Sequence, residues 1–291
     1  MKNEISVLVV VVLYQVEAGK CVTLNTFCQA LKAFETANPF KLFIYDNSPA
    51  PSGLSINIPI PYVYIHDEFN SGLAQAYNAA LQIAETENFE WLLLLDQDTV
   101  ITNEYLQRLC MDLKDYVGDA DCAAFVPRLT SKHKMLSPSR VLSWGRLPAV
   151  DSSFTGIAPF EITAYNSGTV LRVSAMRMIG GFNPVFWLDF LDHWIFNRLQ
   201  FYGYKIYVLN ATLMHDLSLN NMSNVSISRY ENVLAAEGQF YLLYKSKIEN
   251  IAYCFRLIIR ALKRLAQGNE HKLFMPTLKH LFYQVHQIWR Q

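Results

Sequence analysis

Residues 91–98 have the sequence Trp-Leu-Leu-Leu-Leu-Asp-Gln-Asp, in which five apolar residues are followed directly by a pair of carboxylates. An unbroken apolar run of this length is typical of a strand covered on both faces, as in a parallel sheet. Asp96 and Asp98 are two positions apart, so in an extended chain their side chains point the same way. Neighbouring carboxylates repel each other unless a cation lies beside them, and Mg²⁺ or Mn²⁺ suits such oxygen ligands. The stretch predicts a buried strand that ends at a cation site; a solvated turn is the alternative.

The segments before this strand alternate between strand and helix patterns. We expect strands over 5–13, 41–45 and 62–65, and helices over 22–34, 73–83 and 102–113. This alternation indicates an α/β fold with a mostly parallel, Rossmann-like central sheet flanked by helices. In such sheets ligands bind beyond the carboxyl ends of the strands. Asp46, the segment after His66, and Asp96 all follow strand ends, which predicts a ligand site at that edge.

The second half of the chain is less regular. We expect strands over 122–126, 162–173 and 205–209, and helices over 174–179 and 189–202. Residues 130–160 contain three prolines and several serines, which indicates a loop.

The segment Asn70-Ser71-Gly72-Leu73-Ala74-Gln75-Ala76-Tyr77-Asn78 has a small residue at every second position from 72 to 76. Small residues allow a ligand or another backbone to approach closely. Asn70 could cap the helix that follows and leave its first N–H groups directed at an anion. A capped helix packed tightly on the sheet is the alternative.

Charge and composition exclude several classes of protein. The 25 basic and 25 acidic side chains cancel, which argues against a general nucleic-acid-binding protein. Apolar residues make up 52% of the chain, so it is not disordered as a whole. The five cysteines form no Cys-x-x-Cys pair, and no signal peptide is visible, so we expect reduced thiols in a cytoplasmic protein.

The charge is distributed unevenly along the chain. Residues 245–291 contain nine basic and two acidic residues, whereas 1–244 contain 16 basic and 23 acidic ones. At 100° per residue, one side of the segment 251–265 is apolar and the other basic. The apolar side holds Ile251, Phe255, Ile258, Ile259, Leu262 and Leu265, and the basic side holds Arg256, Arg260, Lys263 and Arg264. We expect a C-terminal amphipathic helix on an anionic membrane; the alternative is a helix packed on the domain with its basic side in water.

Several of these segments resemble a known family when they are taken in order. The segments 9–14, 45–48, 70–78 and 95–98 resemble the nucleotide-sugar half of glycosyltransferase family 2, which has the GT-A fold. The Asp-Gln-Asp form resembles the bacterial rhamnosyltransferase-like branch. Segments 166–168, 180–182 and 186–198 resemble the acceptor side of the family. The resemblance covers about 4–218, which implies a catalytic domain over 1–218, with a nucleotide-sugar half at 1–100 and an acceptor half at 120–218, and a helical basic region over 219–291.

The resemblance implies a role for each matching residue on the donor side. Asp46 would contact the nucleotide base, and Asn70 and Gly72 would lie beside the nucleotide. Asp96 would contact the ribose or the metal, and Asp98 would hold the metal, which is Mn²⁺ or Mg²⁺.

On the acceptor side the resemblance implies that Asp192 is the catalytic base, which takes the proton of the attacking hydroxyl. Asp189 lies one turn away and would orient the acceptor or raise the pKa of Asp192. The structural alternative is that Asp189 caps the helix and Asp192 stabilises its first turn through the helix dipole. Arg198 is retained from the family's helix ending and is expected to bind substrate. Trp194 stands where the family has an acidic residue, which leaves the acceptor class open.

His215 follows the last strand and matches a family histidine, which would complete the metal shell or touch the diphosphate. A structural role is the alternative for a single histidine after a strand. Other cations that could hold a diphosphate are Arg172, Arg177, Arg229 and Lys245.

The resemblance implies an inverting, metal-dependent hexosyltransferase that acts on a lipid-linked intermediate of a cell-surface polysaccharide such as O-antigen or capsule. The implied donor is dTDP-L-rhamnose, with a UDP-hexose as the alternative, and the implied location is the cytoplasm or the inner face of the membrane. A degenerate glycan-binding protein is the non-enzymatic alternative. Nucleotidyl transfer is disfavoured because residues 14–20 form no glycine-rich basic loop. Dehydrogenases and P-loop proteins are excluded because GxGxxG and GxxxxGK[ST] are absent.

Overall fold

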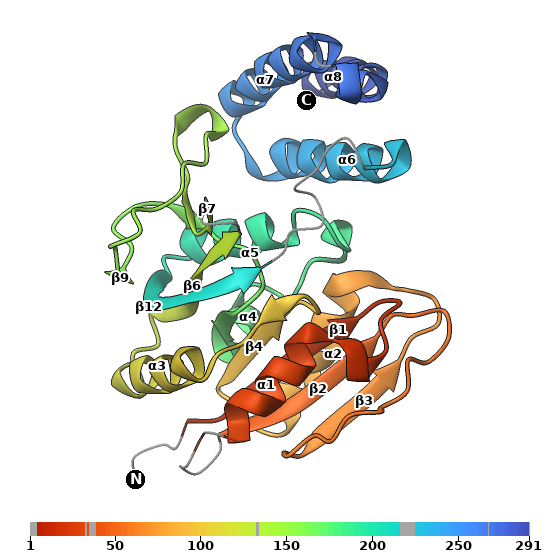
Figure 1. Ribbon diagram of the computed structural model, residues 1–291. Coiled ribbons are helices and arrows are strands. Elements are labelled where there is room, and N and C mark those ends of the chain that lie inside the picture. The colour runs from red at the N-terminus through yellow and green to blue at the C-terminus, as the bar shows by residue number, and fades with distance from the viewer. Residues whose placement is uncertain are drawn as a thin grey trace. The chain divides into compact units, whose positions relative to one another are not determined.

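The computed structural model of the protein describes residues 5–32, 34, 39–131, 134–215, 225–266 and 268–290. The chain divides into two compact units. The α/β unit comprises Met1–Arg140 and Pro148–Asp216, and the helical unit comprises Val141–Leu147 and Leu217–Gln291. Figure 1 shows the first unit in colours from red to cyan and the second mainly in blue.

Four parallel strands form the first half of the central sheet, as predicted. They are arranged in the order β3-β2-β1-β4, with β1 at Val7–Leu13, β2 at Phe40–Asp46, β3 at Tyr62–His66 and β4 at Trp91–Leu95. Leu13 pairs with Asp46 and Asp46 with His66, so the carboxyl ends of these strands are aligned. β4 joins β1 with Leu95 opposite Val11. Asp46 and Asp96 therefore lie at the same edge of the sheet, as expected.

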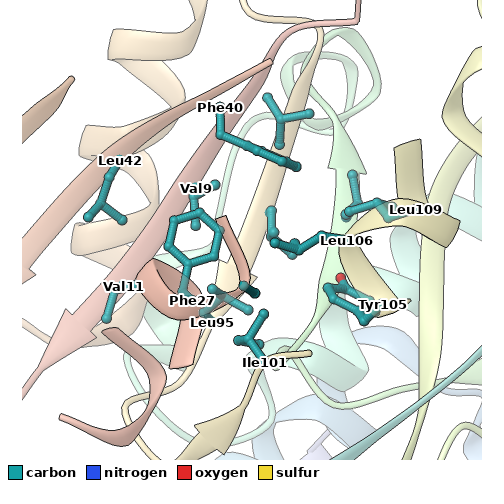
Figure 2. Close-up of a cluster of buried hydrophobic side chains, with 14 of the residues drawn as sticks. Val9, Val11, Phe27, Phe40, Leu42, Leu95, Ile101, Tyr105, Leu106 and Leu109 are labelled. Carbon is teal, nitrogen blue, oxygen red and sulfur yellow. The ribbon is translucent and has the colours of Figure 1, made fainter. Parts of the chain in front are cut away.

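Helices flank this half of the sheet. They are α1 (Val22–Lys32), α2 (Gly72–Thr86) and α3 (Asn103–Asp115). Thr102 is the N-cap of α3, and its hydroxyl accepts a hydrogen bond from the Tyr105 amide at 3.2 Å. Figure 2 shows Val9 and Val11 of β1 facing Phe27 of α1 and Leu106 of α3 in one buried cluster. The cluster holds the strands, and with them the strand ends, in place.

The second half of the sheet is mixed. The strand β11 (Thr169–Arg172) runs antiparallel between β4 and β6 (Cys122–Ser131), and β12 (Lys205–His215) pairs parallel with β6. The short β5 (Thr99–Val100) pairs with the end of β12. The remaining strands are β7 (Lys134–Ser137), β8 (Ser139–Arg140), β9 (Gly156–Ile157) and β10 (Ile162–Thr163).

The prediction of one strand over 162–173 is wrong. The segment forms β10 and β11, with a turn between them in which the Thr169 amide donates to the Asn166 carbonyl at 2.9 Å. Gly168 has a φ of +76°, and a side chain there would collide with Leu213 and Pro127, so only glycine fits this bend. The turn brings residues 166–168 to the carboxyl end of β4.

Two helices complete the α/β unit: α4 (Val173–Met178) and α5 (Leu191–Phe201). The helical unit contains α6 (Ile227–Tyr244), α7 (Lys247–Ala266), a 3-10 segment over Gly268–Leu273, and α8 (Phe274–Arg290). The predicted amphipathic helix lies within α7 and is accompanied by α6 and α8. No helix in the described part of the chain has the length and apolar character needed to cross a membrane.

Candidate active site

The turn that carries Asp96 and Asp98 is held by hydrogen bonds to its main chain. The Thr23 hydroxyl of α1 donates to the Asp96 carbonyl at 2.5 Å and accepts from the Thr99 amide at 2.9 Å. The Asp96 amide donates to the Ser167 hydroxyl at 3.1 Å. Because these bonds use the backbone of the turn, they fix its position.

Gln97, the middle residue of the motif, ties the turn to the end of β1. Its side-chain oxygen accepts from the Tyr14 amide at 2.9 Å, and its amide nitrogen lies 3.4 Å from the Tyr14 carbonyl. An amide side chain satisfies both backbone groups at once, which explains why glutamine suits this position.

Three carboxylates interact at this edge of the sheet. The pKa of Asp96 is raised to about 7, mainly by burial and also by repulsion from Asp98 and Asp192, while a hydrogen bond from Ser167 partly opposes the shift. Burial raises the pKa of Tyr77 well above its usual value, and the negative charges of Asp96 and Asp192 raise it further. The fold thus places the predicted base Asp192, on α5, where it interacts electrostatically with the predicted metal ligand Asp96, which follows β4.

The donor set at this edge fits a hard divalent cation. Carboxylate oxygens are the ligands that Mg²⁺ and Mn²⁺ prefer, and a cation would relieve the repulsion around Asp96. Within the described residues, no three His, Cys, Asp or Glu side chains converge closely enough to hold an ion by themselves. A cation held by Asp96 and Asp98 could take further ligands from diphosphate or water, as Mg²⁺ commonly does, beside the predicted ligand His215.

Asp192 lies in the first turn of α5. The helix begins at Leu191, after Phe190 with a φ of 63°, and the Asp192 carboxylate accepts from the His193 amide at 2.7 Å. Asp189 lies in the turn before the helix, and the N-cap position is Phe190, without a side-chain cap. Asp189 is therefore not the N-cap residue of α5, and its contact with an acceptor stays a prediction.

The small residues at the start of α2 allow the backbone at Trp187 to approach the helix closely. A Cβ atom at Gly72 would lie 2.4 Å from the Trp187 carbonyl oxygen, and the Ala74 amide donates to that same oxygen at 3.3 Å. Further along the helix, the Asn78 side chain donates to the Phe182 carbonyl at 2.7 Å and accepts from its amide at 2.8 Å. The 70–78 motif therefore holds the segment that leads into α5, and the contact of Gly72 with a nucleotide stays a prediction.

Asp67 is a residue that the sequence analysis missed. Its carboxylate accepts from the amides of Phe69 and Ser71, both at 3.0 Å, and from the Tyr45 hydroxyl at 3.0 Å. Burial opposes ionisation, but these hydrogen bonds hold the pKa of Asp67 below its usual value. An Asp just after a strand and before a Gly-containing helix start is a signal for such a turn.

The expectation that Asn70 caps α2 is wrong. The N-cap position is Ser71, which makes no side-chain cap, and Asn70 has a left-handed φ of 50° in the turn that Asp67 closes. Asparagine tolerates this conformation better than most residues. Its contact with a nucleotide stays a prediction.

Asp46 is completely buried and organises the loop after β2. Its carboxylate accepts from the amides of Ser48 and Ser52 at 3.0 and 2.7 Å and from the Tyr64 hydroxyl at 2.7 Å. Burial alone would raise the pKa of Asp46, but these hydrogen bonds outweigh it and hold the pKa below its usual value. The structure thus shows Asp46 as a positioning residue, and its contact with a base stays a prediction.

Two of the suggested diphosphate ligands lie elsewhere. Arg172 is buried, donates to Glu90 at 2.5 Å and stacks 4.0 Å from the ring of Trp91, which begins β4 at the edge opposite Asp96. Arg177 pairs with Glu85, in the last turn of α2. Both suggestions are therefore wrong. Arg229 and Lys245 belong to the helical unit, at the two ends of α6.

Arg198 and His215 close the set of predicted residues. Arg198 lies in the last turn of α5, with its guanidinium 4.5 Å from the ring of Phe201, whereas Asp192 is in the first turn. The backbone of His215 pairs with Thr99, directly after Asp98, but its side chain lies outside the described part of the structure. Their substrate and metal contacts stay predictions.

Residues 8–172, more than half of the chain, match the model of Glycosyl transferase family 2. The chain belongs to this family. The match includes Asp46, the 70–78 motif, Asp96 and Asp98, and it ends before α5. The family match thus covers the half proposed to bind the donor, whereas the position of Asp192 comes from the structure.

Solved structures of a bacterial protein, TarS, are similar to this chain. The crystal structure of S. aureus TarS is 15% identical with a TM-score of 0.51, over 97% of this chain and 53% of that chain. The structure of TarS 1–349 is 15% identical, with a TM-score of 0.49, over 98% of this chain and 88% of that chain. TarS 1–349 in complex with UDP-GlcNAc is 16% identical, with a TM-score of 0.49 and coverages of 96% and 92%. The comparison with curated proteins returns no match. At this identity, the first of these likenesses shows a shared fold.

Proposed function

We propose that this family 2 glycosyltransferase is an inverting, metal-dependent enzyme that transfers a sugar from a nucleoside diphosphate to an acceptor hydroxyl. The observation that carries the proposal is the electrostatic interaction of Asp192, on α5, with Asp96, at the end of β4. In the proposed reaction, Asp96 would act on the donor side of the anomeric carbon and Asp192 on the acceptor side. The proposed catalytic domain is 1–218.

In the proposed reaction, the acceptor hydroxyl oxygen attacks the anomeric carbon of the donor sugar. The bond between that carbon and the diphosphate oxygen breaks, and its electron pair leaves with the nucleoside diphosphate. Asp192 takes the hydroxyl proton as the new bond forms. Because there is a single displacement, the anomeric configuration is inverted.

Asp96 and Asp98 would hold the divalent cation, Mn²⁺ or Mg²⁺, and His215 is a further candidate ligand. The cation supplies positive charge that offsets the charge of the leaving diphosphate. The hydrogen bonds from Thr23, Ser167 and Gln97 fix the turn before substrate binds, so little reorganisation is required of it.

The Asp-Gln-Asp sequence supports L-rhamnose from dTDP-rhamnose as the donor, and a UDP-hexose is the second candidate. For the acceptor we propose a lipid-linked intermediate of a cell-surface polysaccharide, with the enzyme in the cytoplasm or at the inner face of the membrane. Trp194 is buried and occupies the position where the family has a second acidic residue. The acceptor pocket is therefore expected to be more apolar than in other family members.

Calorimetric titration of the purified protein with TDP, UDP and GDP tests the proposal, first with Mn²⁺ and then with EDTA. Binding of one nucleotide that is lost with EDTA supports a metal-dependent donor site and selects the base. If the folded protein binds none of them, the proposal is wrong and a non-catalytic glycan-binding protein takes its place. NMR of the product anomer then tests inversion.

A further inference from the structure

The apolar side of α7 is exposed in the helical unit. Ile248, Phe255, Ile259 and Leu262 have exposed fractions of 75%, 58%, 66% and 59%. Their spacing of three, four or seven residues places them on one side of the helix. This apolar stripe is four turns long and has no cover within the described part of the unit.

The arginines of α7 point the other way, into the helical unit. Arg260 forms two hydrogen bonds with the Glu237 carboxylate of α6, at 2.6 and 2.9 Å. Arg256 stacks on Tyr241 of α6 and donates to a carbonyl in the 141–147 segment, and Arg264 pairs with Glu270. The alternative in which α7 packs with its basic side in water is therefore wrong, because most of that side is used for internal pairing.

A second exposed apolar stripe lies on α8. Met275, Phe282 and Trp289 are seven residues apart and have exposed fractions of 52%, 67% and 85%. The two helices pack side by side (Figure 1), and a groove of about 350 Å³ lies between them. Its lining includes Ile251, Phe255 and Ile258 of α7 and Val285, Ile288 and Trp289 of α8. The two stripes and this groove form one surface, named here the α7–α8 face.

Basic side chains border this face. On the helical wheel of α7, Lys247 and Lys263 lie on either side of the apolar stripe, and both are exposed. Lys279 and Arg290 of α8 are exposed next to its stripe. α8 has no acidic residue, and the single acidic residue of α7, Glu249, is bonded to Ser246 and paired with Lys245. The border of the face is therefore positive.

We propose that the α7–α8 face docks on the surface of an anionic lipid bilayer, with its apolar stripes in the acyl boundary and its border lysines at the headgroups. Exposed aromatic and aliphatic side chains next to lysines are typical of helices that lie in the membrane interface. Lysine stems can lie along apolar surface while their ammonium groups reach phosphate. A second copy of the chain is the less favourable occupant, because a symmetric pairing would bring two positive borders together.

The proposal rests on the helical unit and is independent of donor, metal and transfer. Sedimentation of the full chain with phosphatidylcholine vesicles, with or without about 30 mol% phosphatidylglycerol, tests it in the absence of nucleotide. We expect binding to the anionic vesicles, weak binding to the neutral ones, and loss of binding at high salt. The double variant Ile259→Glu/Trp289→Glu is expected to weaken vesicle binding at least tenfold, because both side chains would have to enter the bilayer as charges.

The matched control is Met111→Glu on α3, whose side chain is 60% exposed in the α/β unit. It introduces one glutamate, half the charge change of the double variant, at an exposed apolar position outside the face and should bind vesicles like the wild type. Lys263→Glu should weaken binding to anionic vesicles about fivefold or more, with little effect on neutral ones.

Sedimentation velocity without lipid shows whether a second copy of the chain covers the α7–α8 face instead. Unchanged vesicle binding by the double variant would overturn the proposal. The proposal would also be overturned if the wild type did not bind vesicles and formed a dimer that the double variant does not form. Far-ultraviolet circular dichroism of each variant confirms that the helices are retained, so a loss of binding is attributed to the face itself.

Discussion

Asn78 and Phe182 exchange two hydrogen bonds, at 2.7 and 2.8 Å, across 104 positions of sequence. The side chain of Asn78 satisfies both the amide and the carbonyl of Phe182, and the ring of Phe182 packs 5.1 Å from that of Tyr77. The donor-side helix α2 is thereby fastened to the segment that leads to Asp192. This contact fixes the position of the segment before Asp192 relative to α2.

Replacing Asn78 with Ala is expected to destabilise the protein by about 2–4 kcal/mol, because two backbone groups of Phe182 lose their partner. We also expect a lower kcat, since the start of α5 is no longer held against α2. Urea unfolding and a transfer assay measure the two effects. Gln75→Ala, at an exposed position on the same helix, is the control and should change neither quantity appreciably. Equal stability of the two variants would contradict the role of the Asn78 contact.

Gly72→Ala is expected to destabilise the fold by about 2–4 kcal/mol. The new methyl group would meet the Trp187 carbonyl, and the backbone has a φ of +87°. Gly180→Ala is a matched control, because its φ is +89° and open space surrounds the position of a Cβ. The control should show the cost of backbone strain alone, about 1 kcal/mol. If thermal unfolding shows equal effects, close approach of Trp187 is not the reason for glycine at position 72.

Asp192→Asn is expected to reduce the rate of transfer by about two to four orders of magnitude, because the variant cannot take the acceptor proton. Nucleotide affinity, measured by calorimetry, should change little. Asp98→Asn should show the opposite pattern, with weaker Mn²⁺-dependent nucleotide binding. Near-normal turnover of Asp192→Asn would show that another group is the base.

The effect of Asp46→Asn should depend on pH. In the folded protein the pKa of Asp46 is lowered from its usual 3.8, so ionised Asp46 stabilises the fold. This contribution is fully present above the unfolded-state pKa and is lost as the pH falls through the folded-state pKa. We expect Asp46→Asn to destabilise the protein by about 1–3 kcal/mol at neutral pH, and by progressively less below about pH 4.

Urea unfolding of both proteins across this pH range measures the difference. Asp151→Asn serves as a control, because Asp151 also has a lowered pKa but lies on an exposed turn and bonds mainly to Ser153. A pH-independent effect of Asp46→Asn would mean that the shape of the side chain, and not its charge, holds the loop after β2.

Local sequence predicted the donor side of the fold well. The apolar runs over 5–13 and 91–95 gave strands β1 and β4, because a strand buried on both faces must be apolar at consecutive positions. The polar residues that follow were expected at one edge, and Asp46 and Asp96 lie there. Strand order in a parallel sheet then follows from short, right-handed connections.

The acceptor side depended on contacts between distant segments. The break in the segment 162–173 is set by the close approach of Leu213 and Pro127 to Gly168, which no local pattern reveals. The turn before α2 is closed by Asp67, whose carboxylate reaches two amides and Tyr45 at once, and Asn70 lies within this turn without capping the helix.

The sequence by itself determined that the parallel strands end in carboxylates and that α7 has an apolar and a basic side. Both properties depend on the spacing of residues along a strand or helix. Only the tertiary structure decided that Asp192 interacts with Asp96 and that the arginines of α7 turn inward. Those outcomes depend on partners far away in the chain, such as Glu237 for Arg260, because a buried charge is stable only where an opposite charge and hydrogen bonds are supplied to it.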